Sequence, residues 1–178
     1  SMRGGLSARL SPQWRFGVSI ETPVFFRVRE DYGSVLETFF DTGGSLAYGG
    51  QSGDAGTGTF RYEIRTPWRL RTGIAYQTSR LHVSLDLEAI DWSQLRFDAA
   101  SNQAFIQDLN RRVREELEPV LNARLGLAYQ LGSTTLYGGL AVFPDPHTSE
   151  IQRSEADRQR VWGSLGISLQ LAESFRLD

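Results

Sequence analysis

The sequence contains no cysteine and no lysine, and no apolar run approaches the roughly 20 residues that a membrane-spanning helix requires. Without cysteine the chain has no disulfide, no thiolate metal site and no cysteine nucleophile. Its 19 basic residues, all arginine, nearly balance 21 acidic ones, and the net charge of −2 gives no electrostatic reason to expect a nucleic-acid partner. These absences argue against a helical membrane protein and against a nucleic-acid-binding domain.

What the sequence does contain is 18 glycines and 11% aromatic residues, a mixture common in all-β chains with many turns. Its 178 residues and mean hydropathy of −0.33 match an ordinary soluble domain. The chain begins Ser1-Met2-Arg3, without the charged and apolar segments of a secretory signal. We therefore expect either a cytoplasmic protein or a piece of a longer one.

Several segments alternate apolar and polar residues, as two-faced β-strands do. The clearest are Trp14–Glu21, Trp68–Gln77, Leu81–Ala89, Leu121–Leu131 and Arg160–Leu171, and the less regular ones are Gly58–Thr66 and Thr134–Phe143. Proline cannot donate to a strand ladder, so Pro67 predicts a kink or bulge. Residues 58–77 are then one long bent strand.

Short and long connections alternate along the chain. The short ones are 11–13, 78–80, 132–133 and 172–174, and the long ones are about 23–57, 93–119 and 144–159. This layout is typical of outer-membrane barrels, which have short periplasmic turns and long extracellular loops. A soluble β-sandwich shows the same alternation of faces. In every clear strand, the residues on the face that would line the lumen are charged or strongly polar, and aromatic residues lie near the strand ends. Both features favour the barrel.

One segment has a helical rather than a strand period. Phe105, Leu109, Val113 and Leu117 recur at helical spacing, joined by Ile106, which predicts an amphipathic helix over residues 102–118. Asn102 is the expected cap and Pro119 the expected stop. Such a helix in a long loop either covers the mouth of the barrel or forms one wall of a groove through which a ligand enters.

Several motifs resemble those of the long-chain fatty acid and hydrocarbon transporters of the bacterial outer membrane, the FadL-like proteins. The resemblance lies in Tyr62–Tyr76 (YEIRTPWRLRTGIAY), Val83–Ser93 (VSLDLEAIDWS), Asn122–Leu131 (NARLGLAYQL), Pro144–Pro146 and Gly163–Ser168. Each motif is weak by itself. Their order and spacing cover nearly the whole chain and are together fairly specific.

The resemblance implies an all-β protein, an antiparallel up-and-down transmembrane β-barrel of roughly fourteen strands, plugged by an N-terminal hatch. It implies passive uptake of hydrophobic small molecules, no enzymatic activity and no cofactor. The partners implied are the hydrophobic ligand, outer-membrane lipid and lipopolysaccharide, with no nucleic acid, and the intact protein is expected to be a monomer. Residues 1–178 correspond to about half of such a barrel, its C-terminal portion, without the hatch, the lateral opening and the final strands.

Candidate ligand-binding residues fall in two groups. Those predicted to face the lumen are Arg69, Arg71, Arg124, His82 and Asp86, and those in long loops are Phe25, Phe26, Phe39, Phe40, Phe105, Ile106 and Leu109. A guanidinium fork suits a fatty-acid carboxylate. The alternative is that the arginines pair with Asp86 and Glu88 to satisfy a wet interior, and that the loop aromatics tuck into the barrel mouth.

The sequence predicts neither catalysis nor a metal site. His82 and Asp86 share a face but lie about 13 Å apart along a strand, too far for a dyad. His147 is a second, isolated histidine. Three functions therefore stay open: a passage for hydrophobic molecules, a non-transporting barrel that serves as a secretion or surface-attachment scaffold, and a soluble β-sandwich that binds a ligand.

Overall fold

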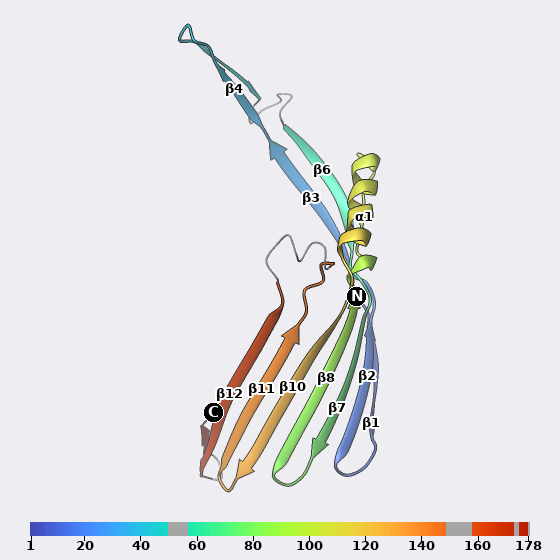
Figure 1. The fold of residues 1–178 in the computed structure, drawn as a ribbon, viewed down its shortest axis with the longest axis vertical. Helices are drawn as coiled ribbons and strands as arrows, with labels where there is room; N and C mark the ends of the chain where they lie inside the picture. The colour runs from blue at the N-terminus through green and yellow to red at the C-terminus, as the bar shows by residue number, and fades with distance from the viewer. Residues whose placement is uncertain (50–56, 149–157, 173–174, 178) are drawn as a thin grey trace.

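The computed structural model describes residues 1–49, 57–148, 158–172 and 175–177. Its main element is an eight-stranded antiparallel sheet with the order β1-β2-β7-β8-β10-β11-β12-β13 (Figure 1). Its strands are β1 Arg3–Arg9, β2 Trp14–Glu21, β7 Arg69–Gln77, β8 Leu81–Asp91, β10 Pro119–Leu131, β11 Thr134–Phe143, β12 Arg160–Ala172 and β13 Phe175–Leu177. Among the described residues β1 and β13 are edge strands, so the sheet is an open, partial β-barrel. This confirms the predicted all-β antiparallel fold.

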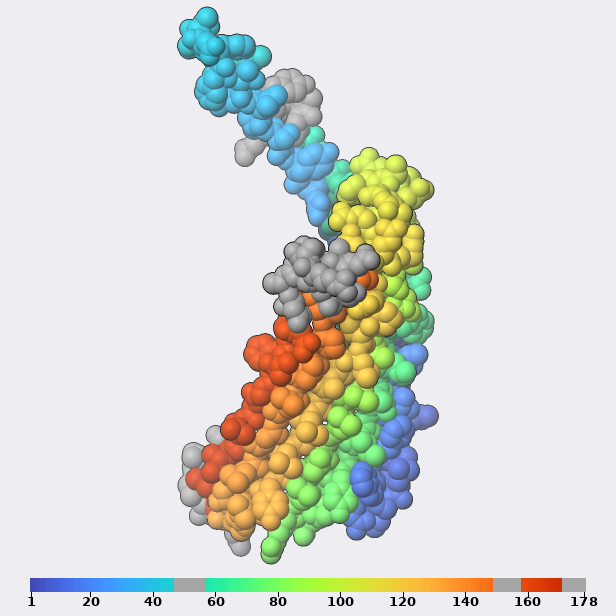
Figure 2. Space-filling model, viewed as in Figure 1, coloured from blue at the N-terminus to red at the C-terminus, as the bar shows by residue number. Residues whose placement is uncertain are grey.

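A narrower extension rises from one end of this sheet. It consists of a three-stranded sheet, β3 Phe25–Gly33, β6 Thr57–Arg65 and β9 Arg96–Asp98, followed by the hairpin β4 Val35–Phe39 and β5 Ser45–Gly49. The hairpin stands clear of the rest of the molecule (Figure 2). The prediction of a long loop over 23–57 is therefore wrong for most of that segment, which is largely β-structure. Alternation is hidden there because β3 carries charged residues on both of its faces.

Two prolines mark the junction between barrel and extension. The register of β2 with β7 continues into that of β3 with β6 without an inserted residue, which places Pro23 opposite Pro67. Neither residue can donate a ladder hydrogen bond, and both are buried. The amide of Thr66 donates to the carbonyl of Val24 at 3.0 Å, while the hydroxyl of Thr66 accepts from the amide of Val24 at 2.9 Å. The predicted irregularity at Pro67 is an interruption: the expected single strand over residues 58–77 is two strands, β6 ending at Arg65 and β7 beginning at Arg69.

The predicted loop helix is α1, Gln103–Glu116, which follows the short 3-10 helix η1, Trp92–Gln94. Asn102 occupies the N-cap position with φ 55° but its side chain makes no capping hydrogen bond. The helix ends at Glu116, before Pro119, with Leu117 as an extended C-cap, and the amide of Glu118 bonds to the carbonyl of Pro146. Within the described residues, no helix has the length and apolar content needed to cross a membrane.

The two faces of the eight-stranded sheet have opposite chemistry. Directly paired residues keep one parity throughout. Most leucine, isoleucine, valine and aromatic side chains therefore share one face, and the charged side chains share the other with small and hydroxyl side chains. The polar face also carries some large apolar side chains, namely Ile90, Val120, Tyr137 and Trp162. On the apolar face, large side chains are exposed by 38% at Leu85 and 94% at Leu165. On the polar face, Glu88 is only 5% exposed. A water-soluble sandwich would show the reverse, with the apolar face covered.

Candidate functional site

A network of ion pairs crosses the polar face of the sheet. Glu88 on β8 accepts a hydrogen bond from Nε of Arg71 on β7 and another, at 3.0 Å, from Nδ2 of Asn122 on β10. A guanidinium nitrogen of Arg124 lies 3.9 Å from the same carboxylate. Arg71 also donates to Glu21 on β2 at 2.8 Å. The network satisfies the carboxylate of Glu88 and ties four strands together through side chains.

Two of the predicted lumenal arginines take part in this network. Arg71 and Arg124 pair with Glu88, which was the alternative to ligand binding, and Asp86 takes no part in an ion pair among the described residues. Arg69 likewise has no ion pair there. His82 lies opposite Gln77 and Ala128, at the turn end of β8, away from the network.

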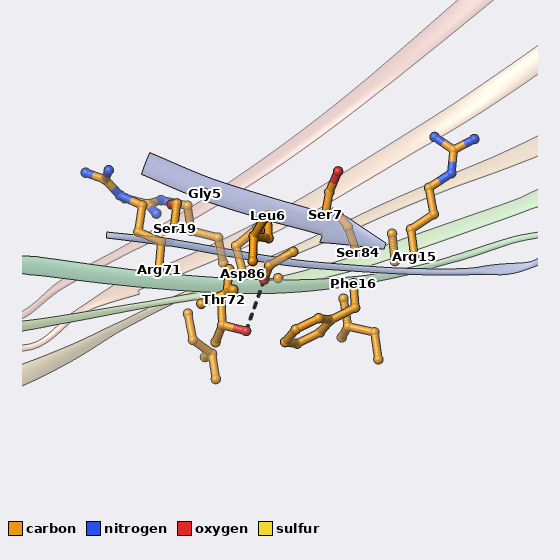
Figure 3. Close-up of a pocket in the computed structure, with 17 residues that line it drawn as sticks. Gly5, Leu6, Ser7, Arg15, Phe16, Ser19, Arg71, Thr72, Ser84 and Asp86 are labelled. Carbon is orange, nitrogen blue, oxygen red and sulfur yellow. Dashed lines mark hydrogen bonds between the residues drawn. The ribbon is translucent and has the colours of Figure 1, made fainter. Parts of the chain in front are cut away.

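Below the network the polar face holds a hollow of about 560 Å³ that Arg71, Asp86 and Arg124 line together. Arg69 and His82 are not among its lining residues. Gly73 makes room for the side chain of Asp86, because a Cβ at position 73 would collide with the Asp86 carboxylate. In Figure 3, Arg15 and Arg71 project from one side of the strands and Phe16 from the other. Three of the five predicted lumenal residues therefore share one hollow.

A second, more apolar pocket of about 500 Å³ lies in the extension, between α1 and the three-stranded sheet. Its lining is Glu30, Tyr32, Phe60, Tyr62, Phe97, Asn102, Phe105, Ile106 and Leu109. The last three were predicted from the helical stripe. The strand aromatics were missed, although Phe60 and Tyr62 alternate on β6 and so share a face. Phe97 lies on a three-residue strand that no periodicity reveals.

The helix wall of this aromatic pocket is fixed to the sheet wall by one side chain. Asn110 accepts from the amide of Phe97 and donates to its carbonyl, both at 2.8 Å. Ile106 is 4% exposed and packs the same helix face. The rings of Phe60 and Tyr62 lie 5.4 Å apart, and those of Tyr62 and Phe97 lie 6.3 Å apart. The pocket is thus a preformed aromatic surface rather than a loose loop.

Polar chemistry at the aromatic pocket is limited to its rim. The hydroxyl of Tyr62 donates to Glu30 at 2.7 Å, and this hydrogen bond raises the pKa of Tyr62, which keeps the phenol neutral. Tyr32 and Asn102 also bring side-chain donors to the lining. Such a site suits flat or flexible apolar molecules, which gain from burial and from ring contacts.

The remaining predicted loop residues do not line this pocket. Phe25 and Phe26 lie on β3 with 63% and 50% of their surface exposed, and Phe25 stacks under the guanidinium of Arg65 at 5.8 Å. Phe39 ends β4 and Phe40 follows it, 75% and 52% exposed. The structure therefore brings Phe105, Ile106 and Leu109 together and leaves these four outside.

Within the described residues no three histidine, aspartate or glutamate side chains gather closely enough to hold a metal ion. His147 instead contacts Asp145 through Nδ1 at 2.6 Å, in the segment after β11. Burial alone would raise the pKa of Asp145, but hydrogen bonds from His147 and from the amide of Arg158 outweigh it and hold the pKa below its usual range. This cluster anchors the segment beside Leu117, which pairs with His147.

Comparison with known proteins gives a likeness of fold. No protein-family model matches the sequence, and no curated protein matches it. Among solved structures, the chain is similar to the crystal structure of a Pseudomonas aeruginosa FadL homologue, with a TM-score of 0.60 and 12% sequence identity. The match covers 98% of this chain and 40% of the homologue. At this identity the likeness establishes the partial-barrel fold and nothing about the cargo.

Proposed function

We propose that this protein is part of a bacterial outer-membrane barrel that lets hydrophobic small molecules, long-chain fatty acids or hydrocarbons, pass inward by diffusion. The aromatic pocket between α1 and the β3-β6-β9 sheet carries the proposal. It offers a preformed apolar binding surface at the end of a strand ladder that continues into the barrel wall. A ligand bound in this pocket would diffuse from there to the barrel wall, because the strand ladder joins the two.

The exposed apolar face of the eight-stranded sheet supports placement in a membrane. Lipid is the solvent in which a face carrying Leu121, Leu125 and Leu165 is stable, whereas in water a patch of this size would drive association. The polar face then lines the interior, where water and the ion pairs of Glu88 satisfy it. The proposed partners are the ligand, the surrounding lipid and lipopolysaccharide, and the protein acts as a monomer without a chemical step.

Binding of the neutral fluorescent probe N-phenyl-1-naphthylamine tests the aromatic pocket. We expect Phe105→Ala to weaken binding about threefold to tenfold, because removing one half-exposed ring forfeits about 1 kcal/mol of apolar contact. The matched control is Phe39→Ala, which removes an equally large exposed ring outside the pocket and should leave binding unchanged. Equal loss in both variants, or in neither, would contradict the proposal.

An uptake assay in whole cells distinguishes passage of the ligand through the barrel from binding of the ligand at the pocket alone. Cells that carry the protein in the outer membrane should accumulate a labelled alkane faster than cells without it, and Phe105→Ala should slow that uptake. Arg69, on the polar face without an ion pair among the described residues, separates the two cargo classes. If a fatty-acid carboxylate contacts the lumen, Arg69→Ala weakens fatty-acid binding and leaves alkane binding unaltered.

A surface-attachment role is the second candidate, and the β4-β5 hairpin is the observation that favours it. The hairpin projects from the molecule and exposes Val35, Leu36 and Leu46 by 63% to 66% (Figure 2). Removal of residues 35–49 should abolish surface attachment and spare uptake if the barrel is a scaffold. Loss of uptake with attachment unaltered would favour transport instead.

A further inference from the structure

Two arginines face each other at the turn end of the sheet, the end opposite the extension. Arg9 on β1 is the direct cross-strand partner of Arg15 on β2. Like charges in directly opposed positions repel and destabilise a strand pair. Elsewhere on this face the chain opposes unlike charges, as in Arg3 with Glu21 and Arg71 with Glu88. On this face the pair of Arg9 and Arg15 is therefore an exception. In the extension Arg29 faces Arg61 and Arg65 faces Arg96 in the same way, but there Arg29 donates to Asp31 and Arg96 to backbone carbonyls.

Within the part of the chain that the structure describes, no carboxylate at this end offsets the two positive charges. The described residues of the turns and adjoining strand ends are 9–15, 76–82, 129–135 and 168–172, and they include Arg9, Arg15 and Arg80 but no aspartate or glutamate. Among the described residues, neither Arg9 nor Arg15 has an ion-pair partner, and both are exposed. The described residues at this end therefore carry basic side chains only, while the acidic residues Glu21, Glu88 and Asp91 lie toward the other end.

The opposed arginines line a hollow of about 620 Å³ together with two aromatic residues of the apolar face, Trp14 and Tyr76. The two rings contact each other with their centroids 4.8 Å apart. The turn beneath them is ordered, since the hydroxyl of Ser11 accepts hydrogen bonds from the amides of Gln13 at 3.2 Å and Trp14 at 3.1 Å. The hollow thus lies on the rim of the sheet, where its charged and apolar faces meet.

We propose that this hollow binds the headgroup of an anionic phospholipid, with the phosphate between the guanidinium groups of Arg9 and Arg15. Guanidinium forks match phosphate oxygens in geometry, and basic pockets beside membrane-facing surfaces bind anionic headgroups. Trp14 and Tyr76 occupy the interfacial level that such aromatic residues prefer, and the acyl chains lie along the exposed apolar face that begins with Phe16. The proposal rests on the membrane placement above but is independent of the cargo.

The test uses the full chain inserted into vesicles, with lipid adducts retained after detergent extraction counted by native mass spectrometry. In vesicles of equal phosphatidylglycerol and phosphatidylcholine, we expect selective retention of phosphatidylglycerol. The double variant Arg9→Gln, Arg15→Gln should reduce that selectivity about thirtyfold, because it removes two cationic contacts. It should still fold, since it also removes a repulsion. Arg61→Gln is the matched control. Arg61 is an exposed arginine of the extension that also faces an arginine, Arg29, but there Asp31 accepts from Arg29 and supplies a negative charge.

Three outcomes are distinguished. Retention of phosphatidylglycerol by the native chain and by Arg61→Gln, but not by the double variant, supports the site. Insertion with equal retention of both lipids, or with selectivity unchanged in the double variant, overturns this inference and leaves the proposed passage intact. Failure to insert into any vesicle overturns the membrane placement, and this inference with it.

Discussion

The buried carboxylate of Glu88 offers the sharpest test of how the barrel wall is stabilised. Its side chain is 7% exposed and accepts from Arg71 and Asn122, so Glu88→Gln replaces an acceptor oxygen by an amide that cannot serve both donors. Breaking a fully buried pair costs about 3–5 kcal/mol. Arg71 is 25% exposed and keeps Glu21, so we expect about 2 kcal/mol for this substitution.

Urea unfolding of the protein in phosphatidylcholine vesicles, followed by tryptophan fluorescence, measures this loss. A loss of about 2 kcal/mol lowers the midpoint by about 1 M for a typical slope. The matched control is Asp86→Asn, two residues away on the same face and without an ion pair among the described residues, which should change stability by less than about 0.5 kcal/mol. If both variants cost the same, the reasoning from the network is refuted.

Three further predictions address local packing, the aromatic pocket and pH. Gly5→Ala should destabilise by about 1–2 kcal/mol, because its Cβ would lie 2.9 Å from a serine Cβ across the strand, while Gly4→Ala meets nothing within 4 Å and should be neutral in the same urea assay. Asn110→Ala removes both hydrogen bonds to Phe97, about 2 kcal/mol together, and should speed exchange of that amide about thirtyfold by NMR. Folding lowers the pKa of Asp145, so the ionised side chain contributes its full stabilisation above the unfolded pKa of about 3.9. That stabilisation is lost as the pH falls through the folded pKa. Asp145→Asn should remove this loss of stability at acid pH, as measured by unfolding at a series of pH values.

The barrel strands could be predicted because successive residues of each strand face two different media, an apolar one and an aqueous one, which produces a pattern of period two. Leu81–Ala89 and Leu121–Leu131 alternate strictly, and the structure places them side by side as β8 and β10. The strand β3 escaped prediction because neither of its faces is purely apolar, since Glu30 and Arg29 point to opposite sides. Strict alternation arises where one face of a strand is buried and the other is not, and β3 is exposed along almost its whole length.

The site was predictable only where a single element carries it. Phe105, Ile106 and Leu109 share one helix face and could be recognised together. Their partners Tyr62 and Phe97 join them through the pairing of β6 with β9, a long-range register that no local pattern contains. Glu88 could be expected to pair with the lumenal arginines because it lies on the same predicted face. The hydrogen bond from Asn122 to Glu88 could not be expected, because it depends on the pairing of β8 with β10.

The opposed prolines at the base of the extension divide one strand pair into two cooperative units. Strand pairing normally transmits unfolding from rung to rung, but at Pro23 and Pro67 the ladder is carried only by the hydrogen bonds between Val24 and Thr66. We therefore expect the extension to open and close separately, while the strand pairs of the wall below it stay formed. A capture site mounted in this way can exchange ligands on its own timescale while the barrel retains its full stability.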